Sequence, residues 1–311
     1  MPNIVIFGAS GLVGSAIRRR LQHTKNNVFY PTSKECDLLK YNEVFCYLKN
    51  KHIDYVYLCA AKVGGIIANK NYPVEFYTIN TQIGLNVLKA AHEKKVKKLL
   101  YLGSTCIFPQ ICPQPMKEEH LLTGIVEPTN EAYALAKIGI LRLCDYYNKE
   151  YGTNFISVMP TNVFGIGDNY HPQHAHAVPS MIRKIHEAKV NNIKEIVCWG
   201  DGSPVREFIY SDDLAEGLVF VMENYNNEYG FINIGTGKGE TIKDLYKIVM
   251  KVLEYEGELI FDTSKPNGNP LKVCDVSKIN ALGWKSKISL EEGIYRTYQH
   301  LKEINFKWKE K

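Results

Sequence analysis

The sequence contains no apolar run of the roughly 18 residues that a membrane-spanning helix needs, no internal repeat and no low-complexity segment. Its eight cysteines include no C-x-x-C pair, and most have apolar neighbours. The start, MPNIVIFGAS, lacks both the basic residues and the long apolar core of a signal peptide. These absences argue against a membrane protein. We therefore expect a cytoplasmic protein whose cysteines are mostly buried, reduced thiols.

The composition is typical of a globular protein. Hydrophobic residues make up 45% of the 311 residues and charged residues 23%, which excludes a disordered, collagen-like or coiled-coil chain. The length corresponds to two units of about 150 residues or to one large one. The net charge of +5 suits an anionic ligand as well as a nucleic acid, so charge alone favours neither class.

Apolar strands alternate with helical patterns through the first half of the chain. Strands are predicted at 3–7, 27–30, 55–60, 98–103 and 155–160, and helices around 16–21, from about 41, at 80–92 and at 131–147. Strands that are apolar throughout are buried on both faces, as in a parallel sheet covered by helices. We therefore predict an α/β fold: a Rossmann-type doubly wound parallel sheet with a smaller C-terminal α+β domain.

The alternation ends near Thr161. Residues 165–180 are rich in Gly, Pro, His and Asn and predict a long loop. Shorter elements follow, namely helix 179–189, strand 194–199, helix 211–223 and a strand within 231–237 that returns to the large sheet. We predict that residues 1–165 form a dinucleotide-binding domain, with 205–240 contributing, and that 166–311 mainly form the second domain.

Three glycines, Gly8, Gly11 and Gly14, directly follow the first strand and precede the first helix. In such a loop the first glycine permits a tight turn, the second lets the backbone approach a pyrophosphate, and the third lets the helix pack against the strand. The pyrophosphate then lies at the N–H groups of the helix start, where the helix dipole favours negative charge. This arrangement predicts a dinucleotide cofactor.

The turn after the second strand, Tyr30 to Lys34, has no acidic residue at the strand end, where an NAD site usually has one for the ribose 2′-hydroxyl. Glu35 lies past the turn, and Lys34 suits the neutralisation of a 2′-phosphate. We therefore predict NADP(H) as the cofactor. The alternative for Lys34 is a solvated surface charge.

Tyr133 and Lys137 stand four residues apart on a predicted helix, so they share one face. A nearby lysine stabilises a phenolate, lowers the tyrosine pKa and lets the phenol exchange a proton with a carbonyl or an alcohol. Ser104 follows the strand 98–103, at the sheet edge where parallel strands bind ligands, and its hydroxyl suits the reacting oxygen. With the glycine loop, these residues resemble the extended short-chain dehydrogenase/reductase superfamily over essentially the whole chain.

Cys106 lies two residues after Ser104, on the same turn. As a thiolate it suits the abstraction of a proton next to a ketone, and inversion of that carbon needs an acid on the opposite face, for which His176 is the best candidate. The alternatives are a packing cysteine and a metal cluster of His171, His174 and His176, although no Cys or acid lies within that run. No Asp-Glu pair follows Ser104, which disfavours a sugar-nucleotide dehydratase.

Longer stretches resemble one family, the GDP-L-fucose synthases, which act on GDP-4-keto-6-deoxy-D-mannose as 3,5-epimerases and NADP(H)-dependent 4-reductases. The matching stretches are 60–66, 103–109, 127–134, 159–162, 176–179 and 199–200. The resemblance implies that Ser104, Tyr133 and Lys137 carry reduction and that Cys106 and His176 carry epimerisation. It also implies a homodimer formed through helices 80–92 and 133–149, with no nucleic acid, membrane or metal as partner.

The same resemblance implies the remaining site residues. Cofactor-binding positions are Gly8, Ser10, Gly11, Leu12, Val13, Gly14, Ser33, Lys34, Ala60, Ala61, Lys62, Leu102, Gly103, Lys137, Pro160, Asn162, Val163 and His176. Positions that bind the nucleotide sugar are Thr105, Lys184, Trp199, Arg206, Asn267 and Lys272. The cations among the latter suit a diphosphate, because they neutralise and orient it.

Several positions depart from the family. Ser10 and Ser33 stand where Arg is frequent near the cofactor's 2′-phosphate, Lys184 where Arg is usual, Asn267 where an acid is usual, and Leu271 where a basic residue is frequent. These departures leave open a GDP-linked keto-heptose as substrate and a 4-reductase with little or no epimerase activity. A non-catalytic dinucleotide sensor is a remote alternative, since such proteins commonly lose the Tyr/Lys pair that this chain retains.

Overall fold

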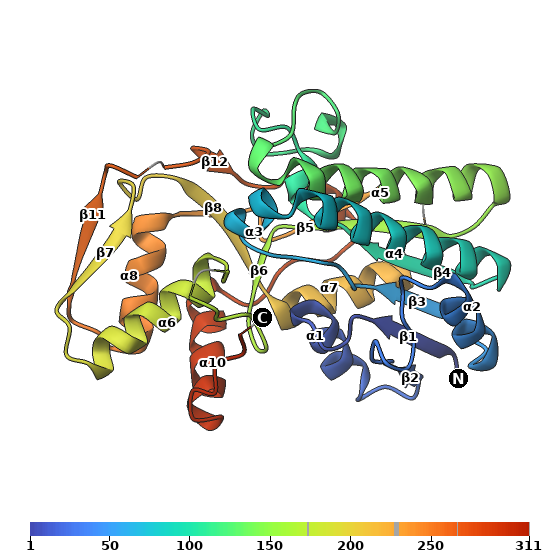
Figure 1. The fold of residues 1–311 in the computed structure, drawn as a ribbon, viewed down its shortest axis with the longest axis horizontal. Helices are drawn as coiled ribbons and strands as arrows, with labels where there is room; N and C mark the ends of the chain where they lie inside the picture. Colours follow the sequence, from blue (N-terminus) through green and yellow to red (C-terminus); the bar gives the residue numbers. More distant parts are fainter. Residues whose placement is uncertain (173, 227–229, 266, 311) are drawn as a thin grey trace.

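A large lobe lies beside a smaller one in the computed structural model, which describes residues 1–172, 174–226, 230–265 and 267–310 (Figure 1). The large lobe is built on a six-stranded parallel sheet in the order β2-β1-β3-β4-β5-β9. Its strands are β1 (Asn3–Phe7), β2 (Asn27–Phe29), β3 (Tyr55–Leu58), β4 (Lys98–Leu102), β5 (Phe155–Pro160) and β9 (Ile232–Ile234). The order runs outward from β1 in both directions, which confirms the predicted doubly wound fold.

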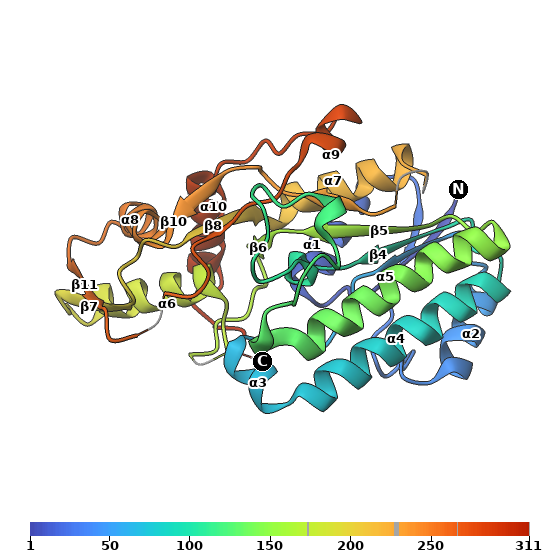
Figure 2. The ribbon, with the colours of Figure 1, turned by 90° about the horizontal axis from the view of Figure 1, so that it is seen from above.

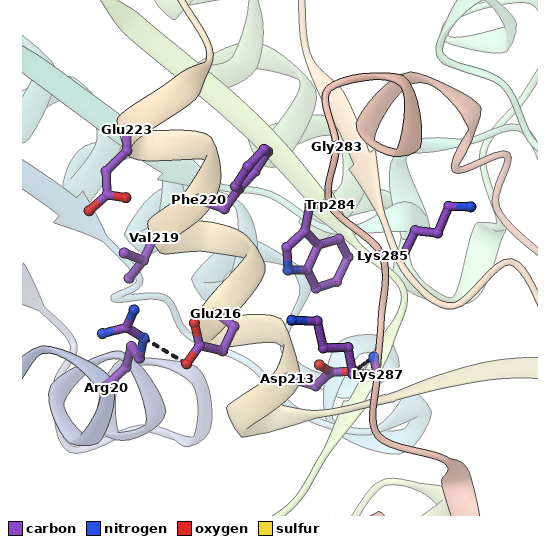
Figure 3. Close-up of a pocket in the computed structure, with 10 residues that line it drawn as sticks. All are labelled: Arg20, Asp213, Glu216, Val219, Phe220, Glu223, Gly283, Trp284, Lys285 and Lys287. Carbon is purple, nitrogen blue, oxygen red and sulfur yellow. Dashed lines mark hydrogen bonds and ion pairs between the residues drawn. The ribbon is translucent and has the colours of Figure 1, made fainter.

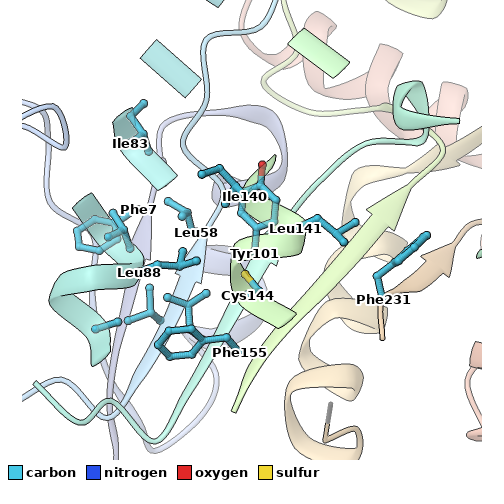
Figure 4. Close-up of a cluster of buried hydrophobic side chains, with 14 of the residues drawn as sticks. Phe7, Leu58, Ile83, Leu88, Tyr101, Ile140, Leu141, Cys144, Phe155 and Phe231 are labelled. Atoms are coloured by element: carbon cyan, nitrogen blue, oxygen red, sulfur yellow. The ribbon is translucent and has the colours of Figure 1, made fainter. Parts of the chain in front are cut away.

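Helices cover both faces of the sheet. On one face, α2 (Tyr41–Asn50), α4 (Pro73–Glu93) and α5 (Glu131–Tyr151) pack over an apolar cluster in which Tyr101 and Phe155 of the strands meet Leu141 of α5 (Figure 4). On the other face, α1 (Leu12–Leu21) and α7 (Ser211–Asn224) cover a second cluster. Because the strands are buried on both faces, their sequences show no polar alternation.

The starts of α4 and α6 differ from the predicted ones. α4 begins at Pro73, seven residues before the predicted start at 80. Proline fits the first turn of a helix, so the helix can begin there. Most of the first residues of α4 face solvent, so no apolar pattern marks this start in the sequence. α6 (Ala177–Val190) begins inside the predicted loop 165–180, since Pro179 lies in its first turn. The predicted strands 3–7 and 155–160 coincide with β1 and β5.

The smaller lobe has its own core, formed between α6, α8 (Ile242–Leu253), α10 (Leu290–Glu303) and short strands. β8 (Val205–Tyr210) pairs with β6 (Asn162–Phe164), β10 (Gly239–Thr241) and β12 (Leu271–Lys272), while β7 (Glu195–Trp199) pairs with β11 (Glu258–Asp262). Seen from above, β6 and β8 lie at the junction of the lobes (Figure 2). Among the described helices, none combines the length and apolar character that a membrane crossing requires.

Candidate active site

The glycine loop joins β1 to α1 in the form that a dinucleotide site requires. Gly8 has φ of +88°, and a Cβ on it would lie 2.6 Å from the nitrogen of Ala60, while a Cβ on Gly14 would lie 2.2 Å from the oxygen of Gly8. Larger residues therefore prevent the close approach of α1 to β1 and β3. No described side chain caps α1 at Gly11, and its first turn holds no acid. The N–H groups at this helix start fit a pyrophosphate.

The carboxylate next to the turn after β2 is hydrogen-bonded within that turn. Glu35 accepts hydrogen bonds from the Thr32 backbone (2.8 Å) and hydroxyl (2.9 Å), which lower its pKa. Ser33 and Lys34 are exposed. The turn thus offers a hydroxyl and an ammonium without a carboxylate at the strand end, and these donors fit the 2′-phosphate of NADP(H).

Loops at the carboxyl ends of the other strands hold the remaining positions expected at the cofactor. After β3, the Asn80 side chain accepts from the Lys62 N–H (2.9 Å) and donates to the Lys62 carbonyl (3.0 Å), while the Lys62 ammonium pairs with Glu75. After β5, Asn162 donates to the Glu207 carbonyl (2.8 Å). Further expected positions border the same edge, namely Ala60, Ala61, Leu102, Gly103, Pro160 and Val163.

Tyr133 and Lys137 lie in the first turns of α5. Lys137 is 3% exposed, and its Nζ donates to the carbonyl of Leu102 at the end of β4 (2.8 Å) and lies 5.5 Å from the centre of the Tyr133 ring. Phe76 of α4 meets the Tyr133 ring edge-on, with centroids 6.2 Å apart. Burial lowers the pKa of Lys137 to about 8. These contacts fix the pair beside the carboxyl end of β4.

The pKa of Tyr133 shifts in the opposite direction to the sequence expectation. Burial, with a smaller contribution from a charge on Cys106, raises the pKa of the phenol well above its usual value, and Lys137 does not reverse this shift. The phenol is therefore protonated at neutral pH. This state suits a proton donor to a forming alkoxide.

Ser104 caps the short 3₁₀ helix η1 (Thr105–Ile107), which packs against α5. Its Oγ accepts a hydrogen bond from the Cys106 N–H (3.3 Å). Burial raises the pKa of the Cys106 thiol, although the Ser104 hydroxyl and the ammonium groups of Lys137 and Lys272 oppose the shift. The thiol is thus protonated at neutral pH, rather than the thiolate expected from the sequence. Both lysines are therefore near enough to the thiol to affect its pKa.

His176 is the N-cap residue of α6, and part of its side chain is exposed. The protein packed around the imidazole keeps some water away from it, and this lowers its pKa. A Cβ on Gly65, the N-cap of α3 (Ile66–Asn71), would lie 3.5 Å from the His174 carbonyl oxygen, and α3 contacts η3 (Pro128–Asn130) just before α5. The start of α6 is therefore connected through α3 to the start of the helix that carries Tyr133.

β8 and β12 bring two cations side by side near the catalytic turn. Arg206 and Lys272 are register partners in this parallel pair. Burial lowers the pKa of both, Arg206 lowers that of Lys272 further, and the carboxylate of Glu127 opposes the shift in each. Lys272 also interacts electrostatically with Cys106. Two partly buried neighbouring cations form an anion site that suits a diphosphate.

The other positions expected at the nucleotide sugar extend this site along the smaller lobe. A Cβ on Gly268 would lie 3.5 Å from the Arg206 guanidinium, and the neighbouring Asn267 accepts a hydrogen bond from the Asp201 N–H (2.9 Å). Lys184 donates to the carbonyl of Val197. Trp199, two residues further along β7, is 68% exposed. The side chains of Asn267 and Lys184 therefore hydrogen-bond to main-chain atoms of the segment 197–201. Trp199, in the same segment, presents an exposed aromatic ring.

Glu207 is a site residue that the sequence analysis did not single out. It is fully buried, and its carboxylate accepts hydrogen bonds from the N–H groups of Thr236 (2.6 Å), Gly237 (2.8 Å) and Cys274 (2.7 Å). It thereby ties the turn after β9 and the segment after β12 to β8, and so holds Arg206 and Lys272 in register. The sequence signal for it is an acid directly before the apolar run 208–210.

A cavity of about 250 Å³ lies elsewhere, between α1, α7 and the segment 283–287 (Figure 3). Arg20 and Glu216 form an ion pair of 2.6 Å at its edge, and Asp213 accepts a hydrogen bond from the Lys287 N–H (2.9 Å). None of the residues predicted for the active site lines it. Its polar contacts hold α7 against α1 and the C-terminal segment.

The cysteines and histidines outside these contacts show no assembled metal site. Among the described residues, no three His, Cys, Asp or Glu side chains gather as a metal ion requires, and the rings of His171 and His174 stack 4.4 Å apart. All eight cysteines are described and none forms a disulfide. The expectation that they are buried is correct for Cys36, Cys144, Cys198 and Cys274 and wrong for Cys46, which is exposed.

Comparisons with known proteins identify the family of the chain. The model of the NAD dependent epimerase/dehydratase family matches residues 4–235. The chain is 45% identical over 305 residues to the GDP-L-fucose synthase of Escherichia coli K12, covering 95% of each protein. It is 46% identical over 303 residues to GDP-L-fucose synthase 1 of Arabidopsis thaliana, covering 97% of this chain and 94% of the relative.

A solved structure, the GDP-mannoheptose C4 reductase of Campylobacter jejuni with NADP bound, superposes with a TM-score of 0.89 at 34% identity, covering 97% of this chain and 98% of the other. The glycine loop, the Ser104–Tyr133–Lys137 set and Cys106 thus occur in a chain whose full length resembles these enzymes. The chain belongs to the GDP-L-fucose synthase family, within the NAD dependent epimerase/dehydratase family.

Proposed function

We propose that this protein reduces C4 of a GDP-linked 6-deoxy-4-keto sugar with NADPH and inverts C3 and C5, as its membership of the GDP-L-fucose synthase family implies. The observation that carries the proposal is geometric. The 3₁₀ helix η1, which begins after Ser104 and contains Cys106, packs against α5, which holds Tyr133 and Lys137. Arg206 and Lys272 lie side by side in the β8–β12 pair, and Lys272 is near enough to Cys106 to affect the pKa of its thiol. A site of this kind combines an acid and a base that act beside a ketone, a proton donor for the ketone oxygen, and two cations that bind a diphosphate.

Bound NADPH would supply the hydride for the reduction at C4. The chain supplies the proton, since the Tyr133 phenol is protonated at neutral pH and donates to the oxygen at C4. Lys137 holds its ammonium near this ring through its bond to Leu102. The Ser104 hydroxyl, which already accepts from the Cys106 N–H, donates its own hydrogen to the same sugar oxygen.

In the epimerisation, Cys106 and His176 act as an acid–base pair. One removes the proton beside the ketone and the other returns a proton to the opposite face of that carbon, so each inversion leaves the total proton count unchanged. The donors at the C4 oxygen, Ser104 and Tyr133, stabilise the enolate that forms between the two steps. Thr105, on the same turn, contributes to sugar binding.

The substrate lies along the positions from Cys106 through Arg206 and Lys272 to Trp199. Arg206 and Lys272 bind the diphosphate, which places the sugar toward Cys106 and the guanosine toward Lys184, Trp199 and Asn267. Residues 1–165, with 205–240, hold NADP(H), and 166–311 mainly hold the nucleotide sugar. The likeness to an NADP-bound reductase supports the cofactor.

A 4-reductase of a GDP-linked keto-heptose is the second candidate. The likeness to a GDP-mannoheptose C4 reductase favours it, because the identity of 34% extends over nearly the whole chain. The family departures at Asn267 and Leu271 lie at the substrate end and are compatible with a larger sugar.

We also propose a homodimer and a cytoplasmic location. α4 and α5 lie side by side and expose apolar side chains, among them Val74 (72%), Leu135 (44%) and Tyr146 (59%) (Figure 2). A second copy of the same surface covers these groups in a symmetric pair. Light scattering after gel filtration tests this, and a monomeric mass at micromolar concentration would contradict it.

Product analysis by NMR tests the function. Purified protein is incubated with NADPH and either GDP-4-keto-6-deoxy-D-mannose or a GDP-4-keto-heptose. We expect reduction of the hexose to a product inverted at C3 and C5. If the protein binds NADPH tightly but neither substrate causes NADPH to be oxidised, the result would instead support a non-catalytic sensor.

A further inference from the structure

The segment after α10 returns to the junction of the two lobes (Figures 1 and 2). It is anchored on α6, where the rings of Phe306 and His186 stack 3.7 Å apart and Glu310 forms an ion pair with Arg183. Trp308 packs against Tyr170, with ring centroids 5.1 Å apart. These contacts hold the residue between Trp308 and Glu310 in a defined place.

That residue, Lys309, reaches the glycine loop. Its Nζ donates to the carbonyl of Ser10 (3.0 Å), the residue just before the N-cap of α1, and to the carbonyl of Gly167 (2.7 Å). Nearly 300 residues of sequence separate Lys309 from Ser10, so no local pattern joins them. A positive charge therefore lies beside the loop that receives the cofactor's phosphates.

Asp168 helps to keep the ammonium there. The side chain is 4% exposed, its Oδ1 accepts from the Asn169 N–H (2.7 Å), and no described group hydrogen-bonds to its Oδ2. Burial raises the pKa of Asp168 to about 7, and the charge of Lys309 opposes that shift. When it is ionised, the Asp168 carboxylate therefore attracts the Lys309 ammonium at the edge of the glycine loop.

We propose that Lys309 is a cofactor-binding residue that stabilises a phosphate group of NADP(H) on the glycine loop, a proposal that rests on the proposed cofactor. Ser10 and Ser33 stand where arginine is frequent in the family, so those two positions carry no cation here. Lys309 supplies a cation to the same loop from the opposite end of the chain. The phosphate is either the diphosphate or the 2′-phosphate.

The test measures dissociation constants for NADPH and NADH by quenching of protein fluorescence. Lys309→Met keeps most of the side-chain length and removes the charge, and Lys309→Arg keeps the charge. Lys307→Met removes the same charge from an exposed position two residues away. Because a hydrogen bond to a charged group is lost, we expect about tenfold weaker NADPH binding in Lys309→Met and less than about twofold change in Lys307→Met. Thermal unfolding of each variant confirms that it is folded.

Comparison of NADPH with NADH distinguishes the two phosphate groups, because NADH has the diphosphate but lacks the 2′-phosphate. Weakening of both to the same degree assigns Lys309 to the diphosphate, and weakening of NADPH alone assigns it to the 2′-phosphate. Unchanged affinity in folded Lys309→Met, or equal losses in the two methionine variants, would overturn the proposal. Wild-type protein that binds NADPH but reduces no GDP-4-keto sugar would refute the proposed reaction and leave the role of Lys309 standing.

Discussion

Lys272 of β12 lies directly beside Arg206 of β8, as its partner in a parallel strand pair, and both are partly buried. Burial lowers the pKa of both cations, and the charge of Arg206 lowers the pKa of Lys272 further. An anion bound between them relieves this repulsion. The pair therefore favours a ligand with two adjacent negative charges.

Removal of either cation should weaken binding of the nucleotide sugar. We expect Lys272→Met and Arg206→Met each to raise KM for the GDP sugar by about 10- to 100-fold, because a hydrogen-bonded charge pair is lost. Lys149→Met, which removes an exposed charge at the far end of α5, should leave KM unchanged. Steady-state kinetics of reduction at saturating NADPH measures this. A loss confined to kcat would contradict the diphosphate role.

The protonation of Lys137 sets the alkaline limit of reduction. Its pKa of about 8 means that the ammonium is present below pH 8 and is lost as the pH rises through that value. Tyr133 keeps its proton over this range, because its pKa is raised. We expect kcat/KM for reduction to be flat from pH 6 to 7 and to fall above about 8. A profile that is still flat at pH 9.5 would contradict the requirement for a charged Lys137.

Proton exchange at carbon should follow a bell-shaped pH profile. Burial lowers the pKa of His176 and raises that of Cys106, so between the two values the imidazole is neutral and the thiol is protonated. A mechanism that needs one base and one acid is active in that interval and declines on both sides. Deuterium exchange rates across the pH range measure it. A rate that keeps rising at high pH would show that the Cys106 thiolate alone limits exchange.

Glu207 should contribute to both stability and substrate binding. In Glu207→Gln the side-chain amide places N–H donors against backbone N–H donors of Thr236, Gly237 or Cys274. We expect the free energy of unfolding to fall by about 2–4 kcal/mol, together with a higher KM for the GDP sugar. Urea unfolding measures the first effect, with Glu258→Gln at an exposed position as the control. Equal stability of the two variants would contradict this role.

Local patterns predicted the dinucleotide half of the molecule well. The apolar strands and the glycines at 8, 11 and 14 are short-range signals, and the structure places β1, β5 and the tight turn where they indicate. The start of α4 was missed because Val74 and Tyr77 are exposed, so the apolar period there does not mark a buried face.

Long-range relationships were less accessible to sequence reasoning. The spacing of Tyr133 and Lys137 correctly places both at the start of α5, but the pKa of the phenol depends on burial by surrounding elements, which no local spacing reveals. Glu207 and Lys309 act through segments far away in the chain. Glu207 has one short-range signal, its position directly before the apolar run 208–210, whereas Lys309 has none.

The most direct test of the account is deuterium incorporation from D₂O into the product formed from GDP-4-keto-6-deoxy-D-mannose and NADPH, measured by NMR. The wild-type product should carry deuterium at C3 and C5. Tyr133→Phe should still exchange these protons, more slowly because Ser104 is then the remaining donor to the enolate, but should not reduce the ketone. Cys106→Ser should oxidise NADPH without exchange. A reduced wild-type product without deuterium at either carbon would contradict the paired epimerase and reductase, as would equal loss of both activities in the two variants.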